Sequence, residues 1–436
     1  MNAVKMPFAL LLSLTLGACL VHGATHNVGA GQSIQSAIDG AASGDTIVLT
    51  APIAYTGDVS VSGKALTLSS LNPQFASIAG NLSVSGLSAT QKVSLGNLTL
   101  VGSMLVQGAG KIVLTNTSIG TNLELNGTTD AFIRRSTVTG TLTMPGAQDT
   151  NGNPSRLVIL QSTINEKLTS RAAKAWLGYS TFEETYLEGT LEIVGNIFDG
   201  RAFGGIGLDL NGSSTIAHVH NNIIRQFRLS AQQSIENQCI GIRISSGARA
   251  YLLNNAIHSC YDSAPPSTET NCGMGVFVVS TAETKILGNI FWDIYIGGGA
   301  TSGHANIWAP EQNVTVAYNA IKAHKGNGNS FSHLVTGGAL NTSYITDTST
   351  NQITSNFLSN PTGLSYGKAI RNAGPPEAAY LDHDGSRNDI GPNGGRNYIS
   401  NGRTTDKPIP ISFTIAPQVV PIGGTVTIES TGATVK

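Results

Sequence analysis

A nine-residue pattern recurs along most of the chain, with apolar residues at its fourth and ninth positions and usually Asn, Ser or Thr at its seventh. Copies include KVSLGNLTL from Lys92, RLVILQSTI from Arg156 and NVTVAYNAI from Asn313. Their starts are 16 to 37 residues apart, and apolar residues alternate with polar ones within each copy. Alternation with a period of two indicates strands, and variable spacing indicates a constant rung joined by turns of varying length. The pattern predicts an all-β solenoid, in which each coil buries its apolar face against the next.

The seventh position of the repeat becomes Asn in the later copies, at Asn196, Asn222, Asn255, Asn289, Asn319 and Asn356. Successive copies are expected to stack about 4.8 Å apart, the spacing of hydrogen-bonded strands. Side-chain amides at that spacing can hydrogen-bond along the stack, as in cross-β structures. Asn also tolerates the left-handed backbone conformation that a sharp coil corner needs. We therefore predict a structural role for these asparagines.

The composition excludes two classes of partner. Lys and Arg total 25 against 26 Asp and Glu, so the net charge of -1 offers no basic excess for nucleic acid or anionic membranes. Only 12% of the residues are charged, about half of the usual share, whereas 51 are Gly. Apolar residues reach 40%, which excludes a disordered chain and is compatible with short strands and many tight turns.

Residues 1–24 are predicted to be a secretory signal peptide, because Lys5 precedes an apolar run and small residues follow at Gly23 and Ala24. The sequence LGAC that ends at Cys19 permits a second interpretation, a bacterial lipoprotein in which this cysteine is lipidated. The protein is expected to be secreted, or to reside in the periplasm or on the cell surface. No later stretch reaches 18 apolar residues, so no transmembrane span is expected.

Three cysteines follow the predicted signal peptide, at Cys239, Cys260 and Cys272. An exported chain meets an oxidising environment, so one disulfide and one remaining thiol are expected. All three pairings are possible. Cys260 and Cys272 bracket a short polar loop, and a disulfide between them would stabilise the fold by about 3 kcal/mol. We take Cys260–Cys272 as the leading prediction.

Two further segments resemble a known family. Residues 28–39 (VGAGQSIQSAID), followed by GDTIVL at 44–49, are similar to the opening of pectin-lyase-like right-handed parallel β-helix proteins. Residues 382–391 (DHDGSRNDIG) resemble the closing segment of many exported bacterial members. The resemblance implies a right-handed parallel β-helix over residues 25–400. It does not imply one activity, because this fold is used by lyases, hydrolases, esterases, adhesins and phage spikes.

The two ends of the predicted solenoid have their own signals. In the family a short amphipathic helix caps the first coil, and residues 33–42 place Ile34, Ile38 and Ala41 at helical spacing. An N-terminal α-helical cap is therefore expected. The tail at 401–436 shows strand alternation around a Gly423-Gly424 turn, which predicts a C-terminal β-hairpin.

Outward polar and aromatic residues gather in the later coils, after the longest insertions. Alternation along aligned rungs predicts that Asp209, Arg243, Phe277 and Asn306 form one outward column, flanked by His304 and Trp308. Aromatic rings can stack on sugar rings, and charged side chains can hold hydroxyl groups or uronate carboxylates. We expect these six residues to bind a polysaccharide or cell-surface glycan. The alternative is that the first two form only a surface ion pair, worth less than about 1 kcal/mol.

The sequence leaves the catalytic residues unknown. No Asp-Asp pair occurs, and the Asn-Thr-Asp, His-Gly-His and Arg-x-Pro-x-x-Arg signatures of polygalacturonases and pectate lyases are absent. If the protein is an enzyme, it is expected to be a polysaccharide lyase or a glycoside hydrolase. The rival hypothesis is a non-catalytic surface, adhesion or structural scaffold.

A calcium site is a further hypothesis. Asp382, Asp384 and Asp389 offer carboxylate oxygens at a spacing similar to that of calcium loops, which makes Ca²⁺ the one cofactor considered. The same residues suit a turn held by side-chain to backbone hydrogen bonds.

Overall fold

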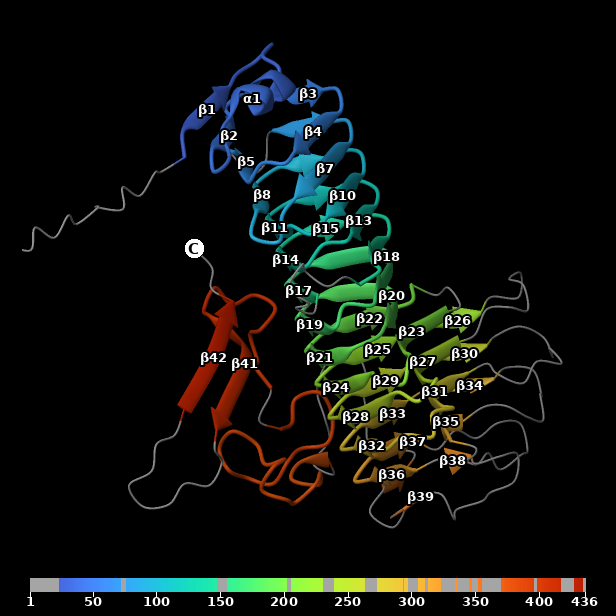
Figure 1. The fold of residues 1–436 in the computed structure, drawn as a ribbon. Helices are drawn as coiled ribbons and strands as arrows, with labels where there is room; N and C mark the ends of the chain where they lie inside the picture. The colour runs from blue at the N-terminus through green and yellow to red at the C-terminus, as the bar shows by residue number, and fades with distance from the viewer. Residues whose placement is uncertain are drawn as a thin grey trace, which may run out of the picture.

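The computed structural model describes residues 23–71, 76–146, 155–201, 205–229, 239–262, 273–292, 294–296, 305–309, 313–322, 334–335, 345–346, 352–354, 370–395, 398–416 and 427–433. Within these ranges the protein is all-β, with long parallel sheets and one α-helix, so the predicted solenoid of stacked coils is confirmed (Figure 1). Each coil contributes a strand to each of three rows. The predicted signal peptide at 1–24, with Cys19, lies almost entirely outside the described residues.

The first row, here called the long sheet, contains the first five positions of the nine-residue repeat. All of its pairings are parallel, and copies of the repeat pair position by position: Lys111 pairs with Asp130 and then with Lys92 on the other side. Its 14 strands in order are β1 Thr25–Val28, β2 Thr46–Leu49, β5 Leu66–Ser70, β8 Lys92–Gly96, β11 Lys111–Thr115, β14 Asp130–Arg134, β17 Arg156–Leu160, β19 Lys174–Gly178, β21 Thr190–Val194, β24 Ile216–His220, β28 Arg249–Leu253, β32 Thr284–Leu287, β36 Val314–Ala317 and β39 Ile345–Thr346.

The other two rows belong to one 23-stranded sheet. The short row follows the corner of each repeat and comprises β3 Ala54–Thr56, β6 Ser77–Ala79, β9 Thr99–Leu100, β12 Ser118–Ile119, β15 Thr137–Val138, β22 Ile197–Asp199, β25 Ile223–Arg225, β29 Ala256–His258, β33 Ile290–Trp292, β37 Ala320–Lys322 and β40 Gln352–Thr354. The loop row follows the insertions and comprises β4 Val59–Ser62, β7 Leu82–Leu87, β10 Met104–Gly108, β13 Leu123–Asn126, β16 Leu142–Met144, β23 Gly205–Leu210, β27 Cys239–Ile244, β31 Met274–Val278, β35 Ala305–Trp308 and β38 Leu334–Val335. The strands β18 Thr163–Ser170 and β20 Thr181–Leu187 run through both rows.

The core lies between the rows and runs along the axis of the solenoid. The fourth position of each repeat points inward, and these side chains form one buried column, Leu95, Leu114, Ile133, Ile159, Leu177, Ile193, Val219, Leu252, Ile286 and Val316. Because the register between neighbouring coils is exact over these positions, identical positions pack on one another along the chain. This arrangement is the physical reason for the apolar fourth position in the sequence.

The corner between the long sheet and the short row depends on the sixth and seventh positions of the repeat. The sixth residue has a positive φ in every described copy, as at Asn97 (55°), Tyr179 (52°) and Gly288 (66°). The seventh residue turns inward and stacks on its neighbours. The expectation that the stacked asparagine itself takes the left-handed conformation is therefore wrong. The residue before it makes the corner, and its backbone N–H donates to the next coil, as from Asn97 to the carbonyl of Thr115 (3.0 Å).

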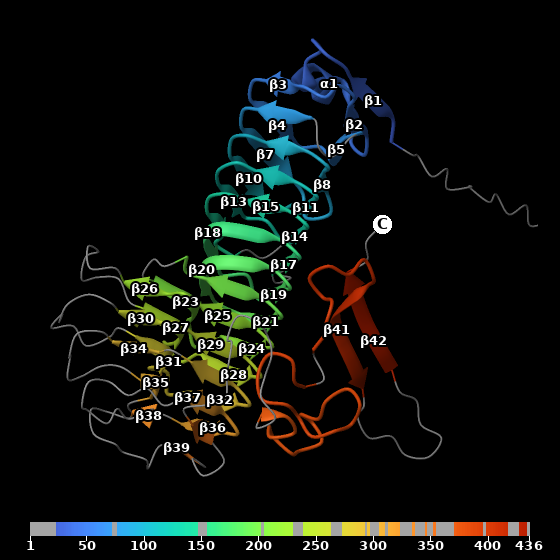
Figure 2. The same cartoon turned by 180° about the vertical axis from the view of Figure 1, so that it is seen from behind.

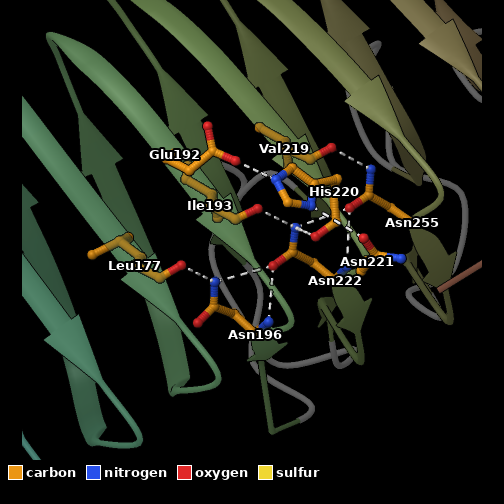
Figure 3. Close-up of polar contacts among 9 residues, drawn as sticks. All are labelled: Leu177, Glu192, Ile193, Asn196, Val219, His220, Asn221, Asn222 and Asn255. Carbon is orange, nitrogen blue, oxygen red and sulfur yellow. Dashed lines mark hydrogen bonds and ion pairs between the residues drawn. The ribbon is translucent and has the colours of Figure 1, made fainter. Parts of the chain in front are cut away.

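The asparagine ladder at the seventh position is confirmed from Asn196 to Asn319, and Figure 3 shows its first part. The Oδ1 atom of Asn222 accepts hydrogen bonds from both the backbone N–H (2.9 Å) and Nδ2 (3.1 Å) of Asn196. The same two contacts repeat between Asn222 and Asn255. Each amide thus satisfies backbone groups that the corner would otherwise bury without partners. The predicted Asn356 lies outside the described residues.

One helix, α1 Ile34–Gly40, lies near the first coils and contacts β1, β2 and β4. Ser33 precedes it and accepts a hydrogen bond from the backbone N–H of Ser36 (3.2 Å), while Ile34 and Ile38 are buried in the main core. Asp45 binds the chain beside it, accepting hydrogen bonds from the backbone N–H groups of Ala24 (2.7 Å) and Ala42 (2.8 Å). No helix among the described residues is long and apolar enough to cross a membrane.

The C-terminal segment, residues 370–409, runs back along the outside of the solenoid (Figures 1 and 2). It starts over the short row, where Ile370 and Ile390 pack on Ile290, and ends over the long sheet, where Ile409 packs with Trp176. Between these points it crosses the corner and hydrogen-bonds to successive coils through the side chains of Asn254, Asn221, Gln161 and Arg135. The segment continues into two antiparallel strands, β41 Ile409–Ala416 and β42 Thr427–Ala433.

Candidate functional site

The outer face of the loop row carries one continuous column of side chains in register. In the later coils this column consists of Tyr186, Asp209, Arg243, Phe277 and Trp308, hereafter the loop-row column. In the earlier coils the same column reads Ser60, Ser83, Leu105, Glu124, Thr143 and Thr169. The face thus changes from mostly small, polar residues to charged and aromatic ones at β20.

Asp209 and Arg243 form the centre of the loop-row column. Nε and Nη2 of the arginine donate to Oδ1 (2.9 Å) and Oδ2 (2.5 Å) of the aspartate, which is a bidentate pair. The Asp209 side chain is only 6% exposed and that of Arg243 27% exposed. The hydrogen bonds that Arg243 donates to Asp209 raise the pKa of its guanidinium above the usual value, although burial opposes them. The pair is therefore charged, mutually neutralised and fixed in orientation.

Phe277 and Trp308 continue the column past the ion pair. Both rings are partly exposed, with centroids 6.4 Å apart and planes inclined by 76°, so one ring meets the other edge-on. The T-shaped contact fixes both rings without covering them completely. An apolar ring face beside a fixed arginine is an arrangement that can hold a sugar ring and its hydroxyl groups together.

The strand register shows that Asn306, which was predicted to belong to the column, is not part of it. Trp308, not Asn306, pairs with Phe277, and Asn306 is buried at 5% exposure. Asp209 also differs from its predicted outward exposure, because Arg243 covers its carboxylate. His304 lies outside the described residues. The structure therefore brings Asp209, Arg243, Phe277 and Trp308 together and separates Asn306 from them.

Tyr186 is a member of the column that sequence reasoning missed. Its hydroxyl donates to Oε1 of Glu188 (2.6 Å), and the guanidinium of Arg171 lies 5.7 Å from its ring centroid. Arg171 also pairs with Glu188 at 3.2 Å. The available signal was the alternation in the β20 sequence TFEETYL, which puts Tyr186 on the outward side one coil before Asp209.

Glu184 lies on the same strand and the same side as Tyr186. Burial raises the pKa of its carboxyl above the usual value, while Lys167, whose Nζ is 4.0 Å from Oε2, opposes that rise. Lys167 and Glu184 are paired in the strand register of β18 and β20. The Lys167–Glu184 ion pair therefore lies where the charged and aromatic part of the loop row begins, beside Tyr186.

Glycines adapt the loop row to the insertions that precede it. A Cβ atom on Gly207 would lie 2.6 Å from the ring of Phe227, and one on Gly275 would lie 2.7 Å from Cδ1 of Ile294. Those two side chains come from the first residues of the insertions, which stack as the short parallel strands β26 Arg228–Leu229, β30 Tyr261–Asp262 and β34 Tyr295–Ile296. The repeated glycine in the sequence of these rungs therefore makes room for the insertions.

The predicted calcium ligands each accept a hydrogen bond from a backbone N–H. Asp382 Oδ1 accepts from the N–H of Gly395 (2.5 Å), Asp384 Oδ1 from Ser386 (2.9 Å) and Asp389 Oδ1 from Asn372 (2.7 Å). Among the described residues, no group of three or more His, Cys, Asp or Glu side chains is placed to hold a metal ion. The Asp384 contact is that of the alternative interpretation, a turn held by a side-chain hydrogen bond, whereas Asp382 and Asp389 link parts of the chain that are 13 and 17 residues apart.

Cys239 and Cys260 are both buried, on β27 and directly after β29. Cys272 lies outside the described residues, so the Cys260–Cys272 disulfide stays a prediction.

The function has to be argued from the geometry of the site alone. No family model matches the sequence, and no curated protein is significantly similar to it.

Proposed function

We propose that the protein is an exported, pectin-lyase-like right-handed parallel β-helix that binds a polysaccharide or cell-surface glycan along the loop-row column. In this proposal α1 caps the first coil and β41 and β42 form a C-terminal hairpin. The supporting observation is the in-register sequence of a tyrosine, a bidentate Asp209–Arg243 pair and two partly exposed aromatic rings. Rungs are about 4.8 Å apart, so the column offers a contact at each step of an extended sugar chain.

The position of the C-terminal segment supports the choice of this face. Its described contacts are with the long sheet, the short row and the corner between them, where it packs on Trp176 and Ile290. The loop row is the remaining face of the same coils, and it carries Phe277 and Trp308. An exposed aromatic and charged surface on a rigid scaffold is the usual form of a binding site.

Binding without cleavage is the form of the function that the described side chains favour. Each carboxylate on the face, Glu184, Glu188 and Asp209, is paired with a cation. A glycosidase needs two carboxyl groups that reach the sugar, one of which gives or takes a proton while the other acts as a nucleophile or activates water. We therefore place polysaccharide processing, including lyase activity, second to binding.

A titration of the purified protein with oligosaccharides tests the proposal. Trp308→Ala and Phe277→Ala should each weaken binding by about 1–3 kcal/mol, because each removes an apolar contact surface. Glu124→Gln is the matched control, since Glu124 is exposed and occupies the same column in an early coil. If the control loses affinity and the two aromatic variants retain it, the site is on another part of the solenoid. If no glycan binds, the rival interpretation, a non-catalytic scaffold, replaces this one.

A further inference from the structure

We infer that the ligand of the loop-row column is an uncharged glycan, and that Asp209 excludes acidic ones by occupying Arg243. This inference rests on the proposed function and names the chemical class of its ligand. The family resemblance alone would suggest a uronate polymer, for which an arginine on the binding face is the obvious anchor. The contacts of that arginine point to a different chemistry.

Each described cation around the loop-row column pairs with a carboxylate. Lys167 pairs with Glu184, Arg171 with Glu188 and Arg243 with Asp209. Two further pairs at the adjoining corner, Arg201 with Glu183 and Arg225 with Asp199, follow the same rule. A polymer with one negative charge per sugar would meet a carboxylate beside every cation. Such a surface has no net attraction for an acidic chain.

Asp209 is the residue that keeps Arg243 from attracting an acidic sugar chain. It takes Nε and Nη2 of Arg243, one of the two bidentate faces of the guanidinium, and its charge cancels the positive charge that would attract a uronate. A uronate could displace it only by leaving a carboxylate that is 6% exposed without its cation. Separating a buried ion pair in this way is strongly unfavourable. Hydroxyl groups of a neutral sugar require no such displacement.

Neutral polar side chains lie next to the Asp209–Arg243 ion pair. Asn211 and Ser245 come directly after the ends of the strands that carry Asp209 and Arg243, and Nδ2 of Asn211 donates to Oγ of Ser245 at 3.1 Å. Amide and hydroxyl groups can both donate and accept, which suits sugar hydroxyls. Together with Phe277 and Trp308, the described side chains offer hydrogen bonds and apolar contact without an unpaired charge.

Calorimetric titration with two panels tests the inference. One panel contains hexasaccharides of glucose, mannose and xylose, and the other contains hexasaccharides of galacturonic and mannuronic acid. The wild-type protein should bind at least one neutral hexasaccharide about tenfold more tightly than either acidic one. Its affinity should change little between about 0.01 M and about 1 M salt, because an uncharged ligand is not screened.

The variant Asp209→Asn gives the sharper result. It releases the Arg243 guanidinium from its bidentate carboxylate, so binding of the acidic hexasaccharides should strengthen about tenfold and become salt-dependent. Glu124→Gln removes one negative charge from an early rung of the same column and should leave the preference unchanged. Circular dichroism checks that each variant is folded, and the wild-type panel decides the question even if Asp209→Asn does not fold.

The outcomes separate the two claims. Tighter binding of an acidic hexasaccharide by the wild-type protein would overturn the inference and leave glycan binding intact. An unchanged preference in a folded Asp209→Asn variant would also overturn it. Failure of every hexasaccharide to bind would remove the proposed function, and the inference with it.

Discussion

Replacing Asn222 by Ala should be one of the most destabilising substitutions outside the apolar core. The side chain is fully buried in the middle of the ladder (Figure 3). Its Nδ2 donates to the carbonyls of Ile193 and His220 and to Oδ1 of Asn255, each at 2.9 Å. Its Oδ1 accepts from the backbone N–H and from Nδ2 of Asn196. Alanine removes all five contacts at once.

The magnitude follows from these contacts. A buried hydrogen bond contributes about 1 kcal/mol, and an unsatisfied buried group costs about 1–3 kcal/mol. Because Nδ2 has two hydrogens for three acceptors, we count four effective bonds and expect a loss of about 3–5 kcal/mol in the free energy of unfolding. A hydroxyl at the same ladder position makes fewer bonds. Ser162 accepts from the N–H of Ser136 and donates to the carbonyl of Leu160, so Ser162→Ala should cost about 2 kcal/mol.

Urea unfolding followed by circular dichroism measures these differences, and hydrogen exchange locates them on the coils around β24. Asn222→Ser is the matched rescue variant, because Ser162 shows that a hydroxyl can accept the neighbouring backbone N–H at this position. It should recover about half of the stability lost in Asn222→Ala. Equal losses in Asn222→Ala and Ser162→Ala would refute the view that the amide ladder stabilises the corner.

Two other predictions concern the ends of the chain. Arg403 of the C-terminal segment donates to the carbonyls of Ser180 (3.0 Å) and Gly195 (3.1 Å), and burial, with repulsion from Arg225, lowers its pKa to about 10. Arg403→Met should therefore expose residues 398–409 to faster hydrogen exchange while the core coils keep their protection; uniform protection would contradict this. Hydrogen bonds from His26 and from backbone N–H groups lower the pKa of Asp45, so its stabilisation is complete above the unfolded value of about 3.9 and is lost as the pH falls through the lower folded value. Exchange around α1 should accelerate in acid, and Asp45→Asn should remove that dependence.

The long sheet and its core could be predicted because one physical rule repeats at each coil. An apolar residue at the fourth position of the repeat must point inward, and Ile193 and Ile286 do so. The stacking of Asn196 on Asn222 was also predictable, since stacked coils leave identical residues one strand spacing apart. In both cases the sequence position alone determines which neighbour a side chain meets.

Other features depend on information that no single repeat contains. The left-handed residue of the corner is Arg135 in one coil and Tyr179 in another, residue types that give no local signal for a positive φ. The placement of Trp308 beside Phe277 required the register across an insertion, and that register puts Asn306 beside Gly275, where it is buried. The path of the C-terminal segment depends on contacts between residues that are more than 200 positions apart, such as Gln161 and Gly402.

The C-terminal segment also connects the fold with the choice of binding face. Solenoid coils expose three outer rows, and each would be equally available for a ligand if the chain ended with its last coil. Here Ile409 and Ile390 cover apolar side chains on the long sheet and the short row of the later coils. The apolar residues Trp176 and Ile290 on those rows are thereby explained as packing positions. Phe277 and Trp308 lie on the third row and have no such explanation among the described contacts of that segment. Their partial exposure beside a fixed Asp209–Arg243 pair is therefore the reason to place a ligand on this row.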